Sequence, residues 1–168
     1  MAINLSKGDN VSFSRSLTNV CVGLGWDPNE GAGHEYDLDA SAFMLGHNGH
    51  LITDEFFVFY NNQLSPDGAV QSTGDDQTGR NSEEGDDETL MVDLAKVDPR
   101  VQEILFTATI YKAEERRQNF GQVSNAYIRI YNSTNEEEIA RYDLNEDFSV
   151  ETAVEFGRLY RSFGEWKF

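Results

Sequence analysis

The chain has 168 residues and a mass of 19.0 kDa, which predicts a single domain, residues 1–168, with one hydrophobic core. Its 30 acidic residues against 13 basic residues give a formal net charge of -17. That charge argues against binding to nucleic-acid phosphates or to anionic membrane surfaces, since both are negatively charged and would repel the chain. A hydrophobic content of 39% and an aromatic content of 12% argue against a disordered chain.

The sequence also indicates where the protein works. It has no run of about 18 apolar residues, and its first twenty residues lack the apolar core of a signal peptide. A single cysteine, Cys21, excludes an intramolecular disulfide framework. Because Cys21 lies between Val20 and Val22, it is typical of a small core residue rather than of a nucleophile. We expect a cytoplasmic protein.

Two strands are predicted near the start of the chain. Residues 19–26 are rich in β-branched and apolar side chains, and they run into a Gly-rich segment. Residues 36–45 contain a stretch in which polar and apolar residues alternate. In a strand this period of two places Asp37, Asp39 and Ser41 on one face.

The middle of the chain carries turn signals between further strands. Asn48-Gly49 predicts a type I′ hairpin turn that leads into a strand over 51–60. Ser65-Pro66-Asp67-Gly68 is a second predicted turn. One or two helical turns are expected over 96–103. Short alternating or apolar runs predict four more strands, over residues 89–94, 104–111, 123–131 and 138–143.

The last element has a different periodicity. Apolar, aromatic and small residues recur there at spacings of three and four, with Arg158 and Arg161 on the other side. The recurring residues are Val150, Ala153, Val154, Gly157, Tyr160 and Phe163. This pattern predicts a C-terminal amphipathic helix that packs on the sheets of a mainly β, antiparallel protein.

The negative charge is concentrated in one part of the chain. Between Arg15 and Lys96 there are 16 acidic residues, and Arg80 is the single basic residue. Within this stretch, residues 74–88 combine seven carboxylates with three glycines and contain no apolar residue, which predicts a loop. Ordering such a loop costs conformational entropy, so an ordered loop needs something that pins it.

Clustered carboxylates without bases favour a hard divalent cation. Calcium takes about 6 to 8 oxygen ligands and accepts them from loops and backbone carbonyls. Zinc would require His and Cys, whereas His47 and His50 flank the predicted hairpin turn and are typical of exposed residues. Three alternatives remain: a solvated acidic loop without metal, a Mg²⁺- or Mn²⁺-dependent hydrolase using the same carboxylates, and an acidic face that contacts a basic partner.

Several motifs stand in order along the whole chain and together resemble a known family, the TerD family of bacterial tellurite-resistance and stress proteins. The motifs are Gly25-Trp26-Asp27, Asp37-Leu38-Asp39-Ala40-Ser41-Ala42-Phe43, Phe57-Val58-Phe59-Tyr60-Asn61-Asn62, Asp67-Gly68-Ala69-Val70, Thr73-Gly74-Asp75-Asp76, Gly85-Asp86-Asp87-Glu88 and Phe156-Gly157-Arg158-Leu159-Tyr160-Arg161.

The resemblance implies a calcium-binding β-sandwich without established catalytic activity. It also implies that the protein acts with other tellurite-resistance proteins, some of them membrane-bound. We expect two Ca²⁺ ions to order acidic loops at one edge of the sandwich, so that the protein serves as a binding or scaffold module. The acidic motif positions that would hold the metal are Asp27, Asp37, Asp39, Asp75, Asp76, Asp86, Asp87 and Glu88.

Overall fold

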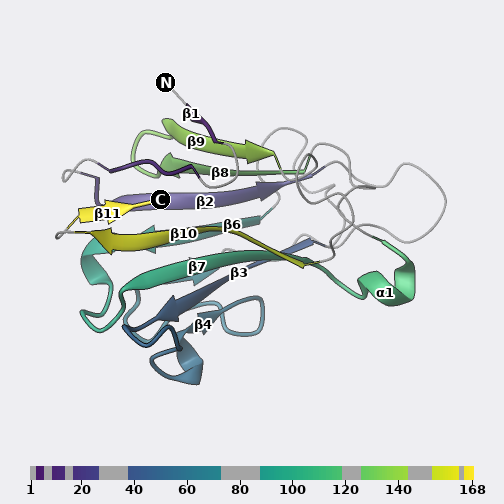
Figure 1. Cartoon of the computed structure of the whole chain (residues 1–168), viewed down its shortest axis with the longest axis horizontal. Coiled ribbons are helices and arrows are strands. Elements are labelled where there is room, and N and C mark those ends of the chain that lie inside the picture. Colours follow the sequence, from purple (N-terminus) through teal and green to yellow (C-terminus); the bar gives the residue numbers. More distant parts are fainter. Residues whose placement is uncertain are drawn as a thin grey trace.

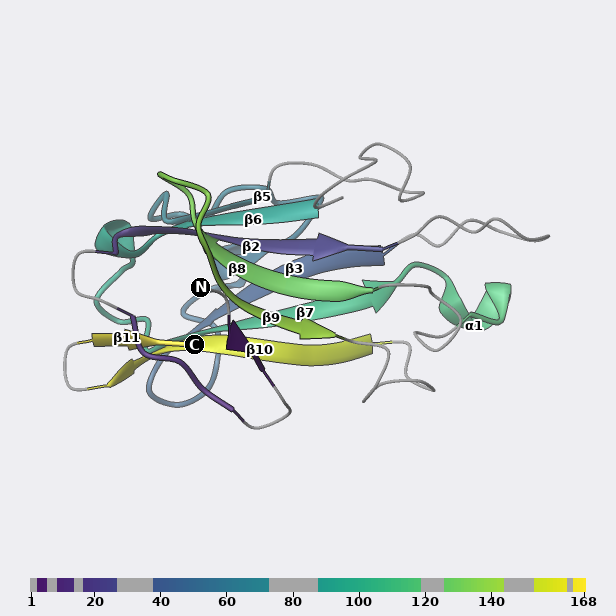
Figure 2. The same cartoon turned by 90° about the horizontal axis from the view of Figure 1, so that it is seen from above.

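The chain folds into two β-sheets, seen from above in Figure 2, where the strands of one sheet overlap those of the other. The structure is a computed structural model that describes residues 3–5, 9–13, 17–26, 38–72, 88–118, 126–143, 153–162 and 165–168. Within these residues, sheet A has the strand order β1-β9-β8-β2-β6-β5, and sheet B has the order β11-β10-β7-β3-β4. All of the strand pairs are antiparallel except β1 with β9.

Figure 1 labels most of these elements along the chain. The strands of sheet A are β1 (Ile3–Asn4), β2 (Asn19–Gly25), β5 (Val70–Ser72), β6 (Glu88–Asp93), β8 (Tyr127–Asn132) and β9 (Glu138–Asp143). Those of sheet B are β3 (Leu38–Leu45), β4 (Phe57–Val58), β7 (Glu103–Ile110), β10 (Ala153–Ser162) and β11 (Glu165–Lys167). The short helical segments are the 3₁₀ turns η1 (Asp54–Phe56) and η2 (Leu94–Lys96), and the α-helix α1 (Ala113–Arg116).

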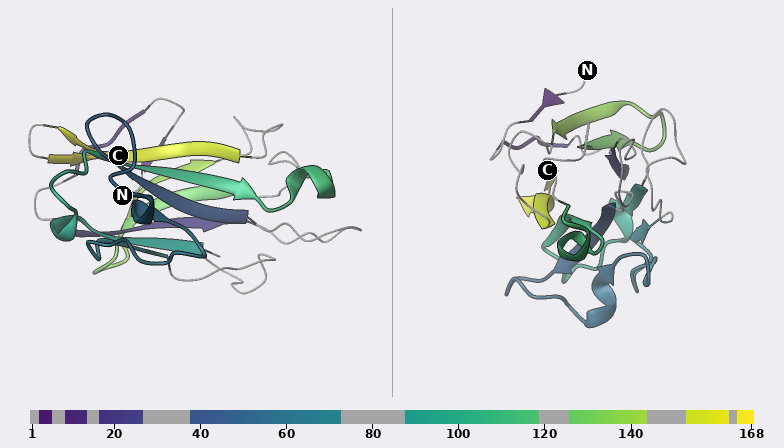
Figure 3. Two further views of the ribbon diagram at one scale, coloured as in Figure 1. Left: turned by 90° about the horizontal axis from the view of Figure 1, so that it is seen from below. Right: turned by 90° about the vertical axis from the view of Figure 1, so that its right-hand side faces the viewer.

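One hydrophobic core lies between the two sheets, whose strands are shown from two further directions in Figure 3. Strand β7 alternates strictly between half-buried and buried residues, and its inward side chains include Ile104 and Phe106. From the opposite sheet, Val22, Leu24 and Ile130 contribute side chains that are almost completely buried. Burying apolar surface on the inner faces is what holds the two layers together, at about 25 cal/mol per Å².

Most of the strands predicted from alternating or apolar runs are confirmed. Residues 19–26, 36–45, 89–94, 104–111 and 138–143 contain or overlap strands β2, β3, β6, β7 and β9. Likewise, β8 falls within and just beyond the predicted range 123–131. The mainly β, antiparallel class is therefore confirmed.

The predicted strand over 51–60 is wrong for most of its length. Only Phe57–Val58 forms a strand there, preceded by the 3₁₀ turn η1. The chain reverses as predicted before it, with Gly49 N–H donating to the Gly46 carbonyl at 3.0 Å. The turn is not type I′, because Gly49 has φ of +75° whereas Asn48 does not have positive φ.

The turn at Ser65 to Gly68 is confirmed and is closed by side chains as well as backbone. The Gly68 N–H donates to the Ser65 carbonyl at 2.9 Å, and Gly68 has φ of +74°. Asp67 Oδ1 accepts from the Ser65 hydroxyl at 2.5 Å and from the Ala69 N–H at 3.0 Å, while its Oδ2 accepts from the Asp98 N–H at 2.8 Å. This carboxylate therefore ties the turn to the segment that precedes β7.

The predicted C-terminal amphipathic helix is wrong. Residues Ala153–Ser162 form strand β10, which pairs with β7. Between Glu155 and Gly157 the register shifts, so that an extra residue, Phe156, is accommodated in a β-bulge. The bulge places the buried side chains of Phe156 and Leu159 three residues apart, which imitates helical spacing in the sequence.

Gly157 and the C-terminal residue pack closely against each other beside this strand. A Cβ at Gly157 would lie 2.7 Å from the ring of Phe168, so the absence of a side chain makes room for that ring. Phe168 is itself buried, with its ring centroid 6.4 Å from that of Phe106. Its backbone also exchanges hydrogen bonds of 2.8 Å with Val11. The end of the chain thus closes one side of the sandwich.

Helical structure is minor in the described ranges. The helical turns expected over 96–103 are reduced to η2, which ends at Lys96, and β7 begins already at Glu103. Helix α1 has four residues and is flanked by two residues in the left-handed conformation, Lys112 and Arg117. None of these described helices has the length and apolar character that crossing a membrane requires.

Candidate metal centre

Four strand ends lie together at one end of the sandwich, which we call the acidic end. They are the end of β2 at Gly25, the start of β3 at Leu38, the end of β5 at Ser72 and the start of β6 at Glu88. The registers require this for the three strands of sheet A, because Leu24 pairs with Glu88 and Ser72 pairs with Leu90 in antiparallel ladders, and the hydrogen bond from Ala40 to Glu88 brings the start of β3 to the same place. In Figure 2 these strand ends lie on the right. The acid-rich segments 27–37 and 73–87 connect these strand ends in the sequence.

Glu88 is a buried carboxylate that links the two sheets. The sequence predicts it as part of a loop, but it is the first residue of β6, where it shares the inward face with the buried Leu90 and Val92 and is only 6% exposed. Its Oε2 accepts a hydrogen bond of 2.7 Å from the backbone N–H of Ala40 in β3. A buried carboxylate needs such donors to offset its loss of hydration.

The short partner strand of β3 explains why Ala40 uses a side-chain acceptor. β4 has only two residues, which pair with Ala42 and Phe43, so β3 extends beyond β4 toward the acidic end. The Ala40 N–H lies in the part of β3 that β4 does not cover, and it is buried. Without an acceptor, this buried N–H would cost free energy. The Glu88 carboxylate supplies that acceptor from the other sheet.

Asp39 lies on β3, one residue before Ala40. The half-buried Asp39 alternates with Leu38 and Ala40, which face the core. Asp39 and Ser41 therefore share the outer face of β3, as the sequence predicted. The hydroxyl oxygens of Ser41 and Thr107 are 2.5 Å apart, which joins β3 to β7 on this face.

The structure describes two of the eight predicted metal ligands, Asp39 and Glu88. The other six, namely Asp27, Asp37, Asp75, Asp76, Asp86 and Asp87, lie outside the described residues. Within the described part of the chain, three or more His, Cys, Asp or Glu residues nowhere gather in a group that could hold a metal ion. The eight donors are all carboxylates, which is the chemistry that suits a hard cation such as Ca²⁺.

The other candidate residues behave as expected from the sequence. Cys21 is buried, at 5% exposure. His47 and His50 are exposed beside the Gly46–Gly49 turn. A feature that sequence analysis missed is a row of stacked aromatic rings on the outside of sheet B, of which the run from Phe57 to Tyr60 was the available signal.

The fold and this end of the molecule define a class: two-sheet β-sandwiches whose acid-rich connecting segments leave from neighbouring strand ends. A homologue of telluride resistance protein TerD from Streptomyces coelicolor A3(2) has the same fold, with a TM-score of 0.74 and 21% identity over 90% of this chain and 86% of that one. The family model described as the TerD domain matches residues 1–168. The chain belongs to the TerD family.

Curated relatives place the chain well inside this family. It is 54% identical to tellurium resistance protein TerD of Serratia marcescens, over 100% of this chain and 88% of that protein. It is 48% identical to general stress protein 16U of Bacillus subtilis, again over 100% of this chain and 88% of the relative. Both names describe resistance or stress response, and neither names a reaction.

Proposed function

We propose that this chain is a calcium-binding, non-catalytic module of cytoplasmic tellurium-resistance and stress responses. In this proposal Ca²⁺ ties the acidic segments to one another at the acidic end of the sandwich. The observation that carries the proposal is the convergence of four strand ends from both sheets. In the sequence, the two segments between those ends contain ten acidic residues and one basic residue, Arg80.

Electrostatics gives the cation its role. Carboxylates brought together without bases repel one another, and a divalent cation offsets that repulsion while accepting their oxygens as ligands. Glu88 supports this arrangement, because its hydrogen bond to Ala40 fixes the start of β6 against β3. Two Ca²⁺ ions would be held by eight carboxylates, namely Asp27, Asp37, Asp39, Asp75, Asp76, Asp86, Asp87 and Glu88.

The same arrangement suits a scaffold. Binding Ca²⁺ would make the acidic end more rigid and less negative, so its contacts with other proteins would depend on the metal. Other tellurite-resistance proteins, including membrane-bound ones, are the proposed partners. The names of the relatives support the resistance and stress context of this proposal.

Thermal unfolding with calcium and with chelator tests the proposal. A ligand that binds only the folded state stabilises it by about 2.7 kcal/mol when its concentration is a hundred times its dissociation constant. We therefore expect the melting temperature to rise with Ca²⁺ and to fall when chelator is added. Calorimetric titration of chelator-treated protein should give a stoichiometry of two ions, and an unchanged melting temperature would contradict calcium binding.

Matched substitutions locate the site. Asp37→Asn and Asp39→Asn should weaken calcium binding strongly, because each removes a proposed carboxylate ligand. Asp54→Asn and Glu55→Gln are the controls, since these residues are exposed in η1 at the opposite end of the sandwich. Equal losses in both sets would mean that calcium binds elsewhere or is held only by overall charge.

A phosphoester screen with Mg²⁺ or Mn²⁺ tests the non-catalytic part. We expect no metal-dependent turnover from the wild-type protein. Turnover that is abolished by Asp37→Asn would replace the scaffold assignment with that of a hydrolase.

A further inference from the structure

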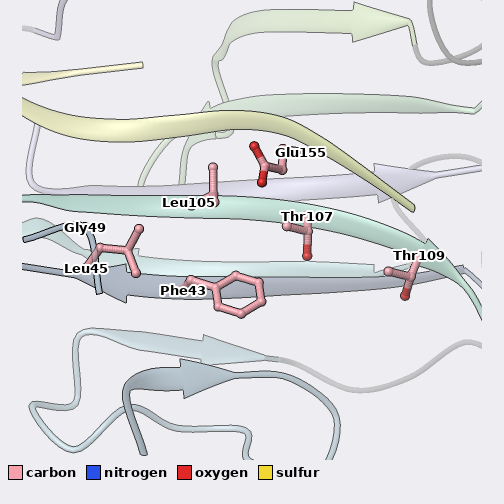
Figure 4. Close-up of a pocket in the computed structure, with 7 residues that line it drawn as sticks. All are labelled: Phe43, Leu45, Gly49, Leu105, Thr107, Thr109 and Glu155. Atoms are coloured by element: carbon pink, nitrogen blue, oxygen red, sulfur yellow. The ribbon is translucent and has the colours of Figure 1, made fainter. Parts of the chain in front are cut away.

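The outer face of sheet B carries an open groove of about 530 Å³ (Figure 4). Residues of β3 and β7 form most of it, with Phe43 and Leu105 in the middle, Leu45 at one side and Thr109 at the other, while Glu155 of β10 lies near Leu105 and Thr107. The volume falls within the range of roughly 300 to 1,000 Å³ that is typical of binding sites. The groove lies on the side of the sheet that faces away from the core.

An aromatic strip extends from this groove to the edge of the sheet. We use this name for Phe43, Phe57, Phe59 and Tyr60. The rings of Phe43 and Phe57 stack with centroids 4.4 Å apart, and those of Phe57 and Phe59 stack at 4.5 Å. Tyr60 meets Phe59 edge to face at 5.4 Å and is 42% exposed. The outer face of an antiparallel sheet is normally polar, so a continuous apolar strip there indicates an interaction surface.

The charged side chains beside the groove include Glu155, Glu103 and Arg158, and Arg158 is opposite Leu105 in the ladder. Glu155, opposite Thr107 in the ladder, is exposed and lines the groove, and no ion pair joins it to another residue in the described part of the chain. The neighbouring acid on this face, Glu103, is already paired with Arg158 at 3.1 Å. Because Glu103 and Arg158 offset each other, Glu155 leaves a negative charge beside the groove, and the complementary partner is apolar and positively charged.

We propose that the outer face of sheet B is a docking site for a segment of another protein that presents an apolar or aromatic side chain beside Lys or Arg. The apolar side chain enters the groove between Phe43 and Leu105, and the basic side chain pairs with Glu155. A protein segment fits better than a small molecule, because the groove is open and continues along a half-buried strip that ends at the exposed Tyr60, whereas small-ligand sites enclose most of their ligand. This inference rests on the scaffold part of the proposed function.

Binding of designed peptides tests the proposal. The probe is a fluorescent 12-residue peptide in which Lys alternates with Leu and Phe, measured by anisotropy at two salt concentrations. One control peptide has Glu in place of Lys, and a second has Ser in place of Leu and Phe, which measures attraction to the charged chain alone. We expect saturable binding of the first peptide, weakened by salt, and much weaker binding of both controls.

Protein variants locate the binding to the groove. Leu105→Thr and Phe43→Thr keep residues suited to a strand, and each should weaken binding about tenfold, the scale of a central apolar contact. Glu155→Gln should weaken it by a factor of about three and reduce its salt dependence. The controls are Met91→Thr, which removes an apolar side chain that is 43% exposed on the outer face of sheet A, and Glu136→Gln, which removes an exposed carboxylate from a turn.

Three outcomes would overturn the docking site: no saturable binding by the wild-type protein, equal losses in Met91→Thr and Leu105→Thr, or self-association of the protein that Leu105→Thr abolishes. The last result would assign this face to a second copy of the chain. Calorimetry with calcium on the same variants separates the two proposals, because the groove variants should keep the wild-type calcium isotherm. A protein that binds peptide but not calcium would overturn the calcium proposal and leave the docking site standing.

Discussion

The two ends of the sandwich differ in how many local donors and bases compensate their carboxylates. At the turn end, which holds the segments 46–56, 64–69 and 94–102, Asp67 accepts three hydrogen bonds from a hydroxyl and two backbone N–H groups. Asp98 is paired there with Arg100 at 2.9 Å. At the acidic end, Glu88 accepts a backbone N–H from the other sheet, and the sequence adds ten acidic residues with one base in the adjoining segments.

Under the proposed function, this difference separates the carboxylates that are satisfied locally from those that would need an external cation. A turn rich in Ser, Asp and Gly exposes backbone N–H groups that satisfy a carboxylate locally. An acid-rich segment that has few bases offers too little compensation of this kind, so a metal ion is the natural counter-charge. Stability at the turn end should therefore be independent of calcium, whereas stability at the acidic end should depend on it.

The largest effect is expected from Asp67→Ala. This change removes three hydrogen bonds to a carboxylate and leaves the Ala69 and Asp98 N–H groups without that acceptor, so we expect a loss of about 3 kcal/mol in the free energy of unfolding. Urea denaturation should give the same loss in calcium and in chelator. A loss that changed with calcium would erase the contrast between the two ends.

A smaller effect is expected from Glu88→Ala in the absence of calcium. The buried Ala40 N–H loses the acceptor that Glu88 provides, at a cost of about 2 kcal/mol, while Glu88→Gln retains an acceptor oxygen and should cost less. With calcium present, the free energy of unfolding of both variants should lie further below that of the wild-type protein, because each variant lacks a proposed ligand carboxylate. If the calcium-dependent gap is zero for both, Glu88 is purely structural.

The smallest effect concerns Asp98 and Arg100. The guanidinium and backbone N–H of Arg100 lower the pKa of Asp98 from 3.8 to about 2. Because the pKa is lower in the folded protein, the stabilisation is present above pH 3.8 and is lost as pH falls toward 2. The melting temperature of Arg100→Gln should be slightly below that of the wild type at neutral pH, and the gap should close at low pH. A gap that is as large at pH 2 as at neutral pH would show that Arg100 stabilises the protein by other contacts, such as its position over the Phe56 ring at 6.0 Å.

The strand regions show how far local sequence information reaches. Alternation identified β3 and placed Asp39 and Ser41 on one face, because side chains in a strand alternate whatever the partner strand is. The same reasoning failed at β10, because the bulge at Phe156 is produced by pairing with β7 and breaks the alternation. In a short segment, apolar residues spaced three or four apart can therefore come from a helix or from a bulged strand. Only the pairing with a partner strand distinguishes the two.

Composition and motif order by themselves determined the mainly β class, the membership of the TerD family and the concentration of acidic residues in one part of the chain. These properties are local or additive, so they can be read from residues in sequence order. The tertiary structure decided that Glu88 reaches Ala40 across the sandwich, that four strand ends meet at the acidic end, and that Phe43, Leu105 and Glu155 share one groove. Each of these depends on the register between strands far apart in the chain, which long-range pairing and core packing fix and which no local pattern encodes.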